Sequence, residues 1–249
     1  MLRYVAVGDS FTEGVGDELS DGRVRGWADL VAAGLAASGG APVHYANFAV
    51  RGRLLAAVVD EQVPAALSLD PLPTLMTLNG GGNDVLRPGV DVSALGRLTE
   101  RAVRQASDAG VRVVLISGAD PSRRLPFGAT IHRRAAELTA AVAEVADRCG
   151  VQLVDAFSDI ELRRPAYWSP DRLHLGPDGH RRVAGLVLSA LGAETAGHAI
   201  DPASDEPRRL TAEARYWREH VLPWIGRRLR RRSSGDGQSG KHPAWTPVR

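Results

Sequence analysis

Residues 3–10 read RYVAVGDS, so a run with β-strand character leads directly into Gly-Asp-Ser. Tyrosine and valine favour a strand, and glycine allows a sharp turn directly after it. In parallel α/β sheets, reactive groups gather at the carboxyl ends of the strands. The stretch therefore predicts the first strand of a parallel sheet, with the Ser10 hydroxyl exposed at its edge.

The pattern around this stretch extends the prediction to most of the chain. Short runs rich in β-branched residues alternate with longer segments of helical periodicity. The expected strands are residues 3–7, 44–48, 74–78, 112–117 and 152–155. The expected helices are residues 27–37, 54–67, 92–109, 130–149 and 178–191. This order predicts an α/β fold, a three-layer α/β/α sandwich around a doubly wound, parallel five-stranded sheet.

The domain is expected to span residues 1–192, followed by a linker and a basic C-terminal extension over residues 193–249. The linker, up to about residue 207, is rich in Ala, Asp, Pro and Gly. A helix is expected at about 210–230, with Leu210, Tyr216, Trp217, Val221 and Trp224 near one face. Residues 233–249 show no periodicity and are expected to be disordered.

The basic pI of about 9.0 comes from this extension. Residues 201–249 carry 11 basic and 6 acidic side chains, whereas the net charge of the whole chain is only +2. The run RRLRRR, from Arg227 to Arg232, could give weak contact with an anionic membrane or a nucleic acid. The alternatives are a solvated extension, or packing of its aromatic residues against the domain. No obligate protein partner is evident.

Cysteine content and hydropathy indicate the cellular compartment of the protein. Cys149 is the only cysteine, which excludes an intramolecular disulfide and argues against a cysteine-rich zinc site. The N-terminal apolar run is too short for a signal peptide, and no later run is long enough to span a bilayer. We therefore expect a soluble, cytoplasmic protein.

Ser10 requires a base, because an unactivated serine hydroxyl is a poor nucleophile. His174 is the best candidate, since Asp171 precedes it by three residues and one helical turn brings such positions close. Asp171 would accept from Nδ1 of His174 and stabilise the imidazolium, while Nε2 takes the Ser10 proton. The order Ser, Asp, His predicts a serine hydrolase if both loops lie on one sheet edge.

Acyl transfer also needs donors for the developing oxyanion. Asn83 lies in the loop GGGND (80–84), after the third expected strand, and offers a side-chain amide beside slim backbone. Gly52 offers an unobstructed backbone N–H after the second strand. With the Ser10 N–H, these groups would form a hole with three donors.

Four segments together resemble the SGNH (GDSL-type) hydrolase family. They are GDS at 8–10, NFAVRG at 47–52, GGND at 81–84 and DRLH at 171–174, with phenylalanine at position 11 where leucine is usual. The resemblance covers residues 4–191 and implies a flavodoxin-like sandwich that hydrolyses small-molecule esters, thioesters or acetylated sugars without cofactor or metal. It also implies Ser10 as nucleophile, Asp171 and His174 as base pair, and Gly52 and Asn83 as oxyanion donors.

Other sites fit the sequence less well. The glycines near residue 14 lack the third glycine of a dinucleotide fingerprint, and GGGND lacks the ending of a phosphate-binding loop. Thr12 stands where a Gly-x-Ser-x-Gly elbow requires glycine, which argues against the α/β-hydrolase fold. His180 and His174 could suggest a metal pair, but no further ligand completes a set.

Several alternatives remain open at this level. Ser10 could be a helix cap, and Asn83 or Gly52 a turn residue. Asp9 and Asp84 are assigned to loop hydrogen bonds, because the mechanism needs neither. Trp168 either walls the substrate pocket or is buried. An acyltransferase or thioesterase would use the same site, and a binding module acting through the basic tail is the alternative of another class.

Overall fold

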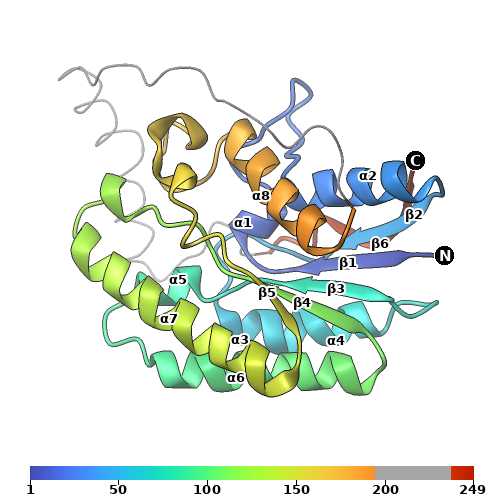
Figure 1. The fold of residues 1–249 in the computed structure, drawn as a ribbon, viewed down its shortest axis with the longest axis horizontal. Helices are drawn as coiled ribbons and strands as arrows, with labels where there is room; N and C mark the ends of the chain where they lie inside the picture. The colour runs from blue at the N-terminus through green and yellow to red at the C-terminus, as the bar shows by residue number, and fades with distance from the viewer. Residues whose placement is uncertain (194–236) are drawn as a thin grey trace.

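The computed structural model describes residues 1–193 and 237–249 of the protein. Over these residues, a six-stranded sheet lies between two layers of helices (Figure 1). The strand order is β5-β4-β3-β1-β2-β6, and all neighbours are parallel except β2 and β6. The strands are β1 (Arg3–Val7), β2 (Val43–Asn47), β3 (Leu75–Leu78), β4 (Arg112–Ile116), β5 (Gln152–Val154) and β6 (His242–Val248).

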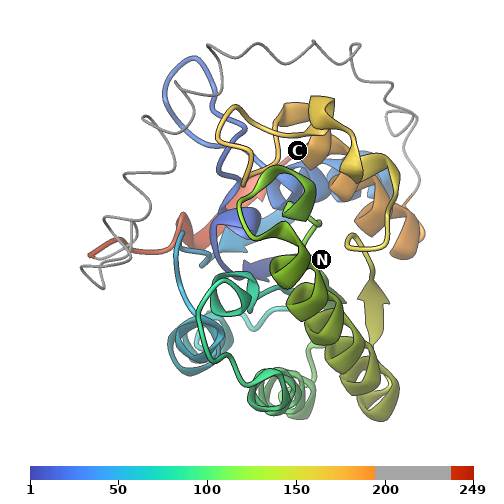
Figure 2. The same cartoon turned by 90° about the vertical axis from the view of Figure 1, so that its left-hand side faces the viewer.

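Both faces of the sheet are buried, which confirms the three-layer α/β prediction. Tyr4 and Ala6 of β1 pack in one core with α2 (Trp27–Gly39) and α8 (Pro177–Ala190). Val5 and Val7 point to the opposite core, because side chains alternate along a strand. Figure 2 looks onto the carboxyl edge of the parallel strands, with the helix layers on either side. The second core is covered by α3 (Leu55–Ala57), α4 (Val63–Leu67), α6 (Val92–Asp108) and α7 (Gly128–Cys149).

Short helical segments follow the strands at this edge. Directly after β1 and β3 come α1 (Ser10–Glu13) and α5 (Gly82–Val85). The helix expected at 54–67 is divided, because α3 and α4 are joined by the π-helical turn η1 (Val58–Gln62). Pro64 follows this turn and has no N–H to bond four residues back, which is consistent with the irregularity. The 3₁₀ turns are η2 (Ser122–Arg124), η3 (Glu161–Arg163) and η4 (Pro165–Tyr167).

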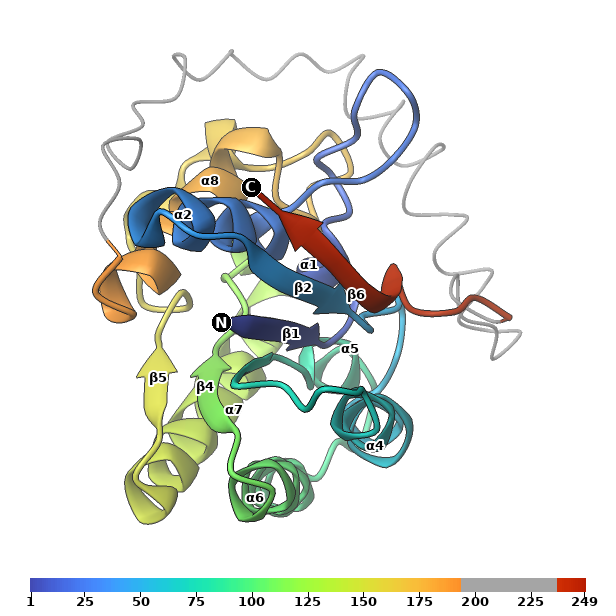
Figure 3. The ribbon, with the colours of Figure 1, turned by 90° about the vertical axis from the view of Figure 1, so that its right-hand side faces the viewer.

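The C-terminal residues form a sixth strand that the sequence analysis did not expect. In β6, Pro247 lies opposite His44 of β2 and His242 lies opposite Asn47, in antiparallel register (Figure 3). The predictions of a five-stranded, wholly parallel sheet and of disorder throughout residues 233–249 are therefore wrong. The two prolines of β6 read as strand breakers, but they are tolerated in an edge strand because an N–H can be spared there.

The remaining predictions for the extension concern residues that the structure does not describe. The linker after residue 193, the helix at about 210–230 and the run from Arg227 to Arg232 lie within residues 194–236, outside the described residues. In the described part of the chain, none of the helices has both the length and the apolar character needed to cross a bilayer.

Candidate active site

Ser10 is the first residue of α1, at the point where the chain leaves β1. Asp9 caps this short helix, because its Oδ1 accepts from the Phe11 N–H at 3.0 Å. A Cβ on Gly8 would lie 2.5 Å from Oγ1 of Thr12, so the turn requires glycine. The strand-to-helix turn therefore presents the Ser10 hydroxyl at the carboxyl edge of the sheet.

Gln62 fixes the same turn from the η1 segment. Its side chain is buried, accepts from the Gly8 N–H at 2.8 Å and donates to the Gly8 carbonyl at 2.9 Å. This role of Gln62 was not predicted from the sequence. The available signal was one amide among the apolar positions Val58, Val59 and Val63 of the expected helix.

Ser10, His174 and Asp171 form one chain of hydrogen bonds. Nε2 of His174 lies 3.0 Å from Oγ of Ser10, and Nδ1 lies 2.5 Å from Oδ2 of Asp171. Their side chains stay partly accessible, at 20% for His174 and 27% for Asp171. The structure thus brings together three side chains, of which Ser10 and His174 are 164 residues apart in the sequence.

The loop that carries Asp171 and His174 is a closed turn, and the helical turn expected for this spacing is wrong. Arg172 has a φ of 61°, in the left-handed region. The Ser169 N–H donates to the His174 carbonyl at 2.9 Å, and Trp168 forms a bridge with Leu175 at the base of the loop. These backbone contacts bring the carboxylate next to the imidazole.

The surroundings of Asp171 keep it ionised. Burial alone would raise the pKa of Asp171, but the hydrogen bonds and charge of His174 lower it well below its usual range. Oδ1 accepts from the Ser169 hydroxyl at 2.6 Å and from the N–H groups of Leu173 and His174 at 3.0 Å each. A carboxylate fixed in this way favours the imidazole tautomer with its proton on Nδ1.

Asn83 and Gly52 lie at the same edge. Nδ2 of Asn83 donates to Oδ2 of Asp9 at 3.1 Å and to the carbonyl of Arg53 at 3.0 Å. These two acceptors neighbour Ser10 and Gly52 in the sequence. The N–H groups of Gly52 and Ser10 have no acceptor among the described residues. The arrangement leaves two backbone N–H groups without an acceptor among the described residues, whereas the Asn83 amide already donates to two.

Asp9 and Asp84 make the loop hydrogen bonds expected of them. Besides Asn83 and Phe11, which bond to Asp9, the Leu55 N–H donates to Oδ2 of Asp84 at 3.0 Å. Burial raises the pKa of Asp9 to about 6, and the charge of Asp84 adds to this. The group beside Asn83 therefore changes charge close to neutral pH.

Glu13 connects α1, the helix that begins with Ser10, with the loop of Gly52, a role that was not predicted from the sequence. Its carboxylate accepts from the Arg51 N–H at 2.6 Å and pairs with the Arg51 guanidinium at 2.5 Å. Arg51 directly precedes Gly52, so Glu13 constrains the backbone that carries the Gly52 N–H.

A second Asp–His pair lies away from these residues. Nδ1 of His132 is 2.8 Å from Oδ2 of Asp120, and both line a cavity of about 280 Å³ with Ser122, Arg123, Gly128, Ala129 and Arg163. Ser122 bonds to Asp120 through its N–H at 3.0 Å, and no serine hydroxyl bonds to His132 in the described part of the chain. This pair thus provides a natural comparison for Asp171 and His174.

Trp168 and His180 are structural. Trp168 is buried, and its Nε1 donates to the Leu162 carbonyl at 2.6 Å. His180 is fully buried, its Nδ1 accepts from the Trp27 N–H and its Nε2 donates to the Val15 carbonyl. Over residues 1–193 and 237–249, no three side chains of His, Cys, Asp or Glu are grouped as metal ligands.

Comparison with known structures reveals the same fold. The esterase EstA from Pseudoalteromonas sp. is 16% identical, with a TM-score of 0.61 over 77% of this chain and 97% of that chain. LAE5, an alpha/beta hydrolase enzyme from the metagenome of Lake Arreo, is 22% identical, with a TM-score of 0.65 over 78% of this chain and 97% of that chain. A variant of the acetyl xylan esterase Axe2 from Geobacillus stearothermophilus is 18% identical, with a TM-score of 0.61 over 78% and 96%.

The sequence itself matches one family. No curated protein matches the chain. Residues 6–182 match the model of the GDSL-like lipase/acylhydrolase family, and this range contains Ser10, Gly52, Asn83, Asp171 and His174. The chain therefore belongs to the GDSL-like lipase/acylhydrolase family and is an ester-hydrolysing enzyme.

Proposed function

We propose that the chain hydrolyses carboxylic esters of small molecules through an acyl-enzyme on Ser10. The observation that carries the proposal is the continuous contact from Oγ of Ser10 through His174 to Asp171, at 3.0 and 2.5 Å. Both distances lie within reach of proton transfer. Membership of an acylhydrolase family supports the reaction class, and EstA and Axe2 are themselves esterases.

Acylation begins when Nε2 of His174 takes the proton of Ser10 and Oγ attacks the ester carbonyl. The carbonyl π bond breaks, and its electron pair moves to the oxygen. Asp171 stabilises the imidazolium without taking its proton, as its low pKa requires. The imidazolium then protonates the leaving alcohol as the C–O bond breaks, and the acyl group stays on Ser10.

Three donors would stabilise the oxyanion: the N–H groups of Ser10 and Gly52 and the side chain of Asn83. The two backbone groups are available in the described residues, whereas Asn83 already donates to Asp9 and Arg53. An oxyanion would therefore compete with the carboxylate of Asp9 for one N–H of Asn83. Neutralisation of Asp9, whose pKa is about 6, favours the oxyanion in that competition.

Deacylation repeats the chemistry with water as nucleophile. His174 takes a proton from the water molecule as its oxygen attacks the acyl carbon. The same donors stabilise the second oxyanion, and its collapse breaks the bond to Oγ. The proton returns from His174 to Ser10, so the carboxylic acid leaves and the enzyme is restored.

The test uses a short-chain nitrophenyl ester and a fluorophosphonate label. We expect Ser10→Ala to abolish both turnover and labelling, and His174→Gln to lower kcat by at least about 1000-fold. His132→Gln is the matched control, because it alters the other Asp–His pair and should leave kcat close to wild type. Undiminished hydrolysis by Ser10→Ala would overturn the proposal.

A further inference from the structure

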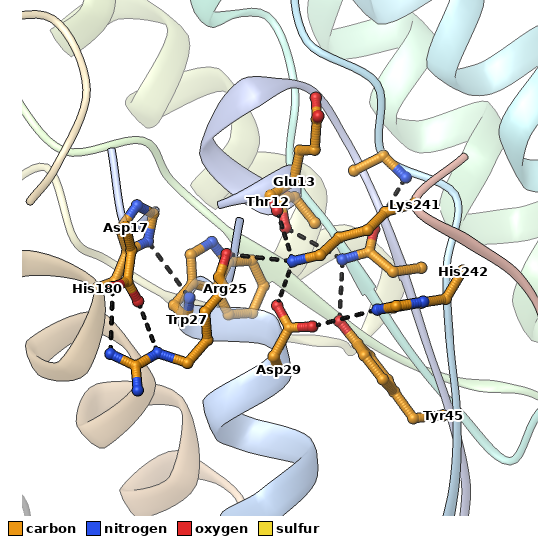
Figure 4. A network of polar contacts seen from close by, with 12 residues as sticks. Thr12, Glu13, Asp17, Arg25, Trp27, Asp29, Tyr45, His180, Lys241 and His242 are labelled. Carbon is orange, nitrogen blue, oxygen red and sulfur yellow. Dashed lines mark hydrogen bonds and ion pairs between the residues drawn. The ribbon is translucent and has the colours of Figure 1, made fainter. Parts of the chain in front are cut away.

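Lys241 is the only lysine of the chain, and its ammonium group is partly buried, with three hydrogen-bond acceptors. Its side chain is 10% exposed. Nζ donates to the Glu13 carbonyl at 2.8 Å, to the Arg25 carbonyl at 3.1 Å and to Oδ2 of Asp29 at 2.7 Å (Figure 4). An ammonium has three protons, so each one has an acceptor.

These acceptors lie where two backbone segments cross. Glu13 is the last residue of α1, and Arg25 and Asp29 lie on either side of the start of α2. A Cβ on Gly14 would lie 1.4 Å from the Arg25 carbonyl oxygen, and a Cβ on Gly26 would lie 2.4 Å from Cα of Gly14. The segments thus touch through glycine backbone, and Lys241 bonds to both.

Glu13 connects this crossing to the site. Its carbonyl accepts from Lys241, while its carboxylate pairs with Arg51, next to Gly52. A carbonyl at the end of a helix has no partner within the helix, so the ammonium satisfies a group that would otherwise be left unpaired. Lys241 therefore fixes the end of the helix that begins with Ser10.

The sixth strand determines where Lys241 lies. A Cβ on Gly240 would lie 2.7 Å from Cα of Phe48, so the chain passes close against the end of β2. The next residue after Lys241 is His242, whose ring lies edge-on to Tyr45 at 5.9 Å between centroids. In the middle of β6, Nε1 of Trp245 donates to the Pro71 carbonyl at 3.0 Å, away from α1.

We propose that Lys241 is a positioning residue for the ester hydrolysis, and that β6 delivers it to the end of the nucleophile helix. This inference depends on the proposed function of Ser10. Lys241 touches neither Ser10 nor His174. It acts through the Glu13 carbonyl, which keeps α1 and the loop of Gly52 in the geometry that proton transfer and oxyanion binding require.

The experiment compares full-length Lys241→Met with Trp245→Ala. The second variant removes a side chain that anchors the same strand but does not contact α1. Both variants are assayed well below their melting temperatures. We expect Lys241→Met to lower kcat by roughly ten- to a hundredfold with little change in KM, because misplaced reacting groups lose turnover. Trp245→Ala should keep kcat within about threefold of wild type, even where its melting temperature falls equally.

Hydrogen exchange gives a second readout that does not depend on activity. The N–H groups of Gly14 and Val15 both donate to the Ser10 carbonyl at 3.1 Å. We expect these amides to exchange faster in Lys241→Met than in Trp245→Ala. If Lys241→Met does not fold, Lys241→Gln takes its place in both measurements.

The outcomes separate the two proposals. Wild-type protein that shows no hydrolysis dependent on Ser10 overturns the proposed function, and the exchange comparison still tests Lys241. Equal kcat values in the Lys241 and Trp245 variants, together with equal exchange at Gly14 and Val15, overturn the positioning role alone.

Discussion

At the scale of single residues, the two carboxylate oxygens of Asp171 have different hydrogen-bond partners. Oδ2 bonds to Nδ1 of His174, whereas Oδ1 accepts from Ser169 and from two backbone N–H groups. One oxygen holds the imidazole that we propose as the base, and the other keeps the loop closed.

Asp171→Asn should lower kcat by roughly 1000- to 10,000-fold, because an amide at this position favours the wrong imidazole tautomer. The backbone contacts can be kept if the amide oxygen takes the place of Oδ1, so the melting temperature should change little. Asp120→Asn is the control, since it alters the pair with His132 in the same way. A rate loss of similar size in both variants would contradict the assignment of the base to His174.

How much of the site was predictable depends on sequence separation. Asp171 and His174 are three residues apart, and Ser10 follows a strand, so composition and spacing singled them out. Their catalytic roles stay predictions until the variants are measured. Gln62 and Glu13 were missed because they act on partners 54 and 38 residues away, and no local pattern marks such pairs.

At the scale of elements, the η1 segment supports the turn between β1 and Ser10. Gln62 bonds to both backbone groups of Gly8, two residues before Ser10. The widened π-helical turn lies at functional sites more often than elsewhere, and here it carries the amide that reaches the turn.

Gln62→Leu should lower the free energy of unfolding by about 1–3 kcal/mol, because it leaves the buried Gly8 N–H unsatisfied, whereas the Gly8 carbonyl keeps its bond from the Val50 N–H at 3.2 Å. Urea denaturation checks this value. Gln152→Leu is the control, since Gln152 also makes a side-chain hydrogen bond to backbone but lies at the opposite end of its strand from the site. Equal stability of wild type and Gln62→Leu would contradict the support assigned to this residue.

The elements themselves were predictable where one segment carries its own pattern. The helix expected at 92–109 matches α6 (Val92–Asp108), because its apolar residues recur on one face. The sixth strand was not predictable, since HPAWTPV has two prolines and little alternation. Hydrogen bonds to the open edge of β2 determine its structure, and these depend on an element about 200 residues earlier.

At the scale of the whole molecule, two buried groups give the stability of the fold opposite responses to pH. Burial lowers the pKa of His180 to about 4 and raises that of Asp9 to about 6. His180 stays neutral between Trp27 and Val15, so stability is lost as the pH falls from 6.5 to 4. Asp9 favours its protonated form, so its contribution is present below pH 3.8 and is lost as the pH rises through 6.

Replacing each group should therefore change the pH dependence of the free energy of unfolding in opposite directions. Relative to wild type, His180→Leu should gain about 3 kcal/mol of unfolding free energy from pH 6.5 to pH 4. The variant lacks an imidazole that binds its proton more readily in the unfolded state than in the folded one. Asp9→Asn should lose about 3 kcal/mol from pH 6 to pH 3.8, because it cannot take one up. Urea denaturation at several pH values measures these differences. If the free energy of unfolding changed with pH in the same way in both variants, neither buried group would govern its pH dependence, since every other titrating residue is common to both.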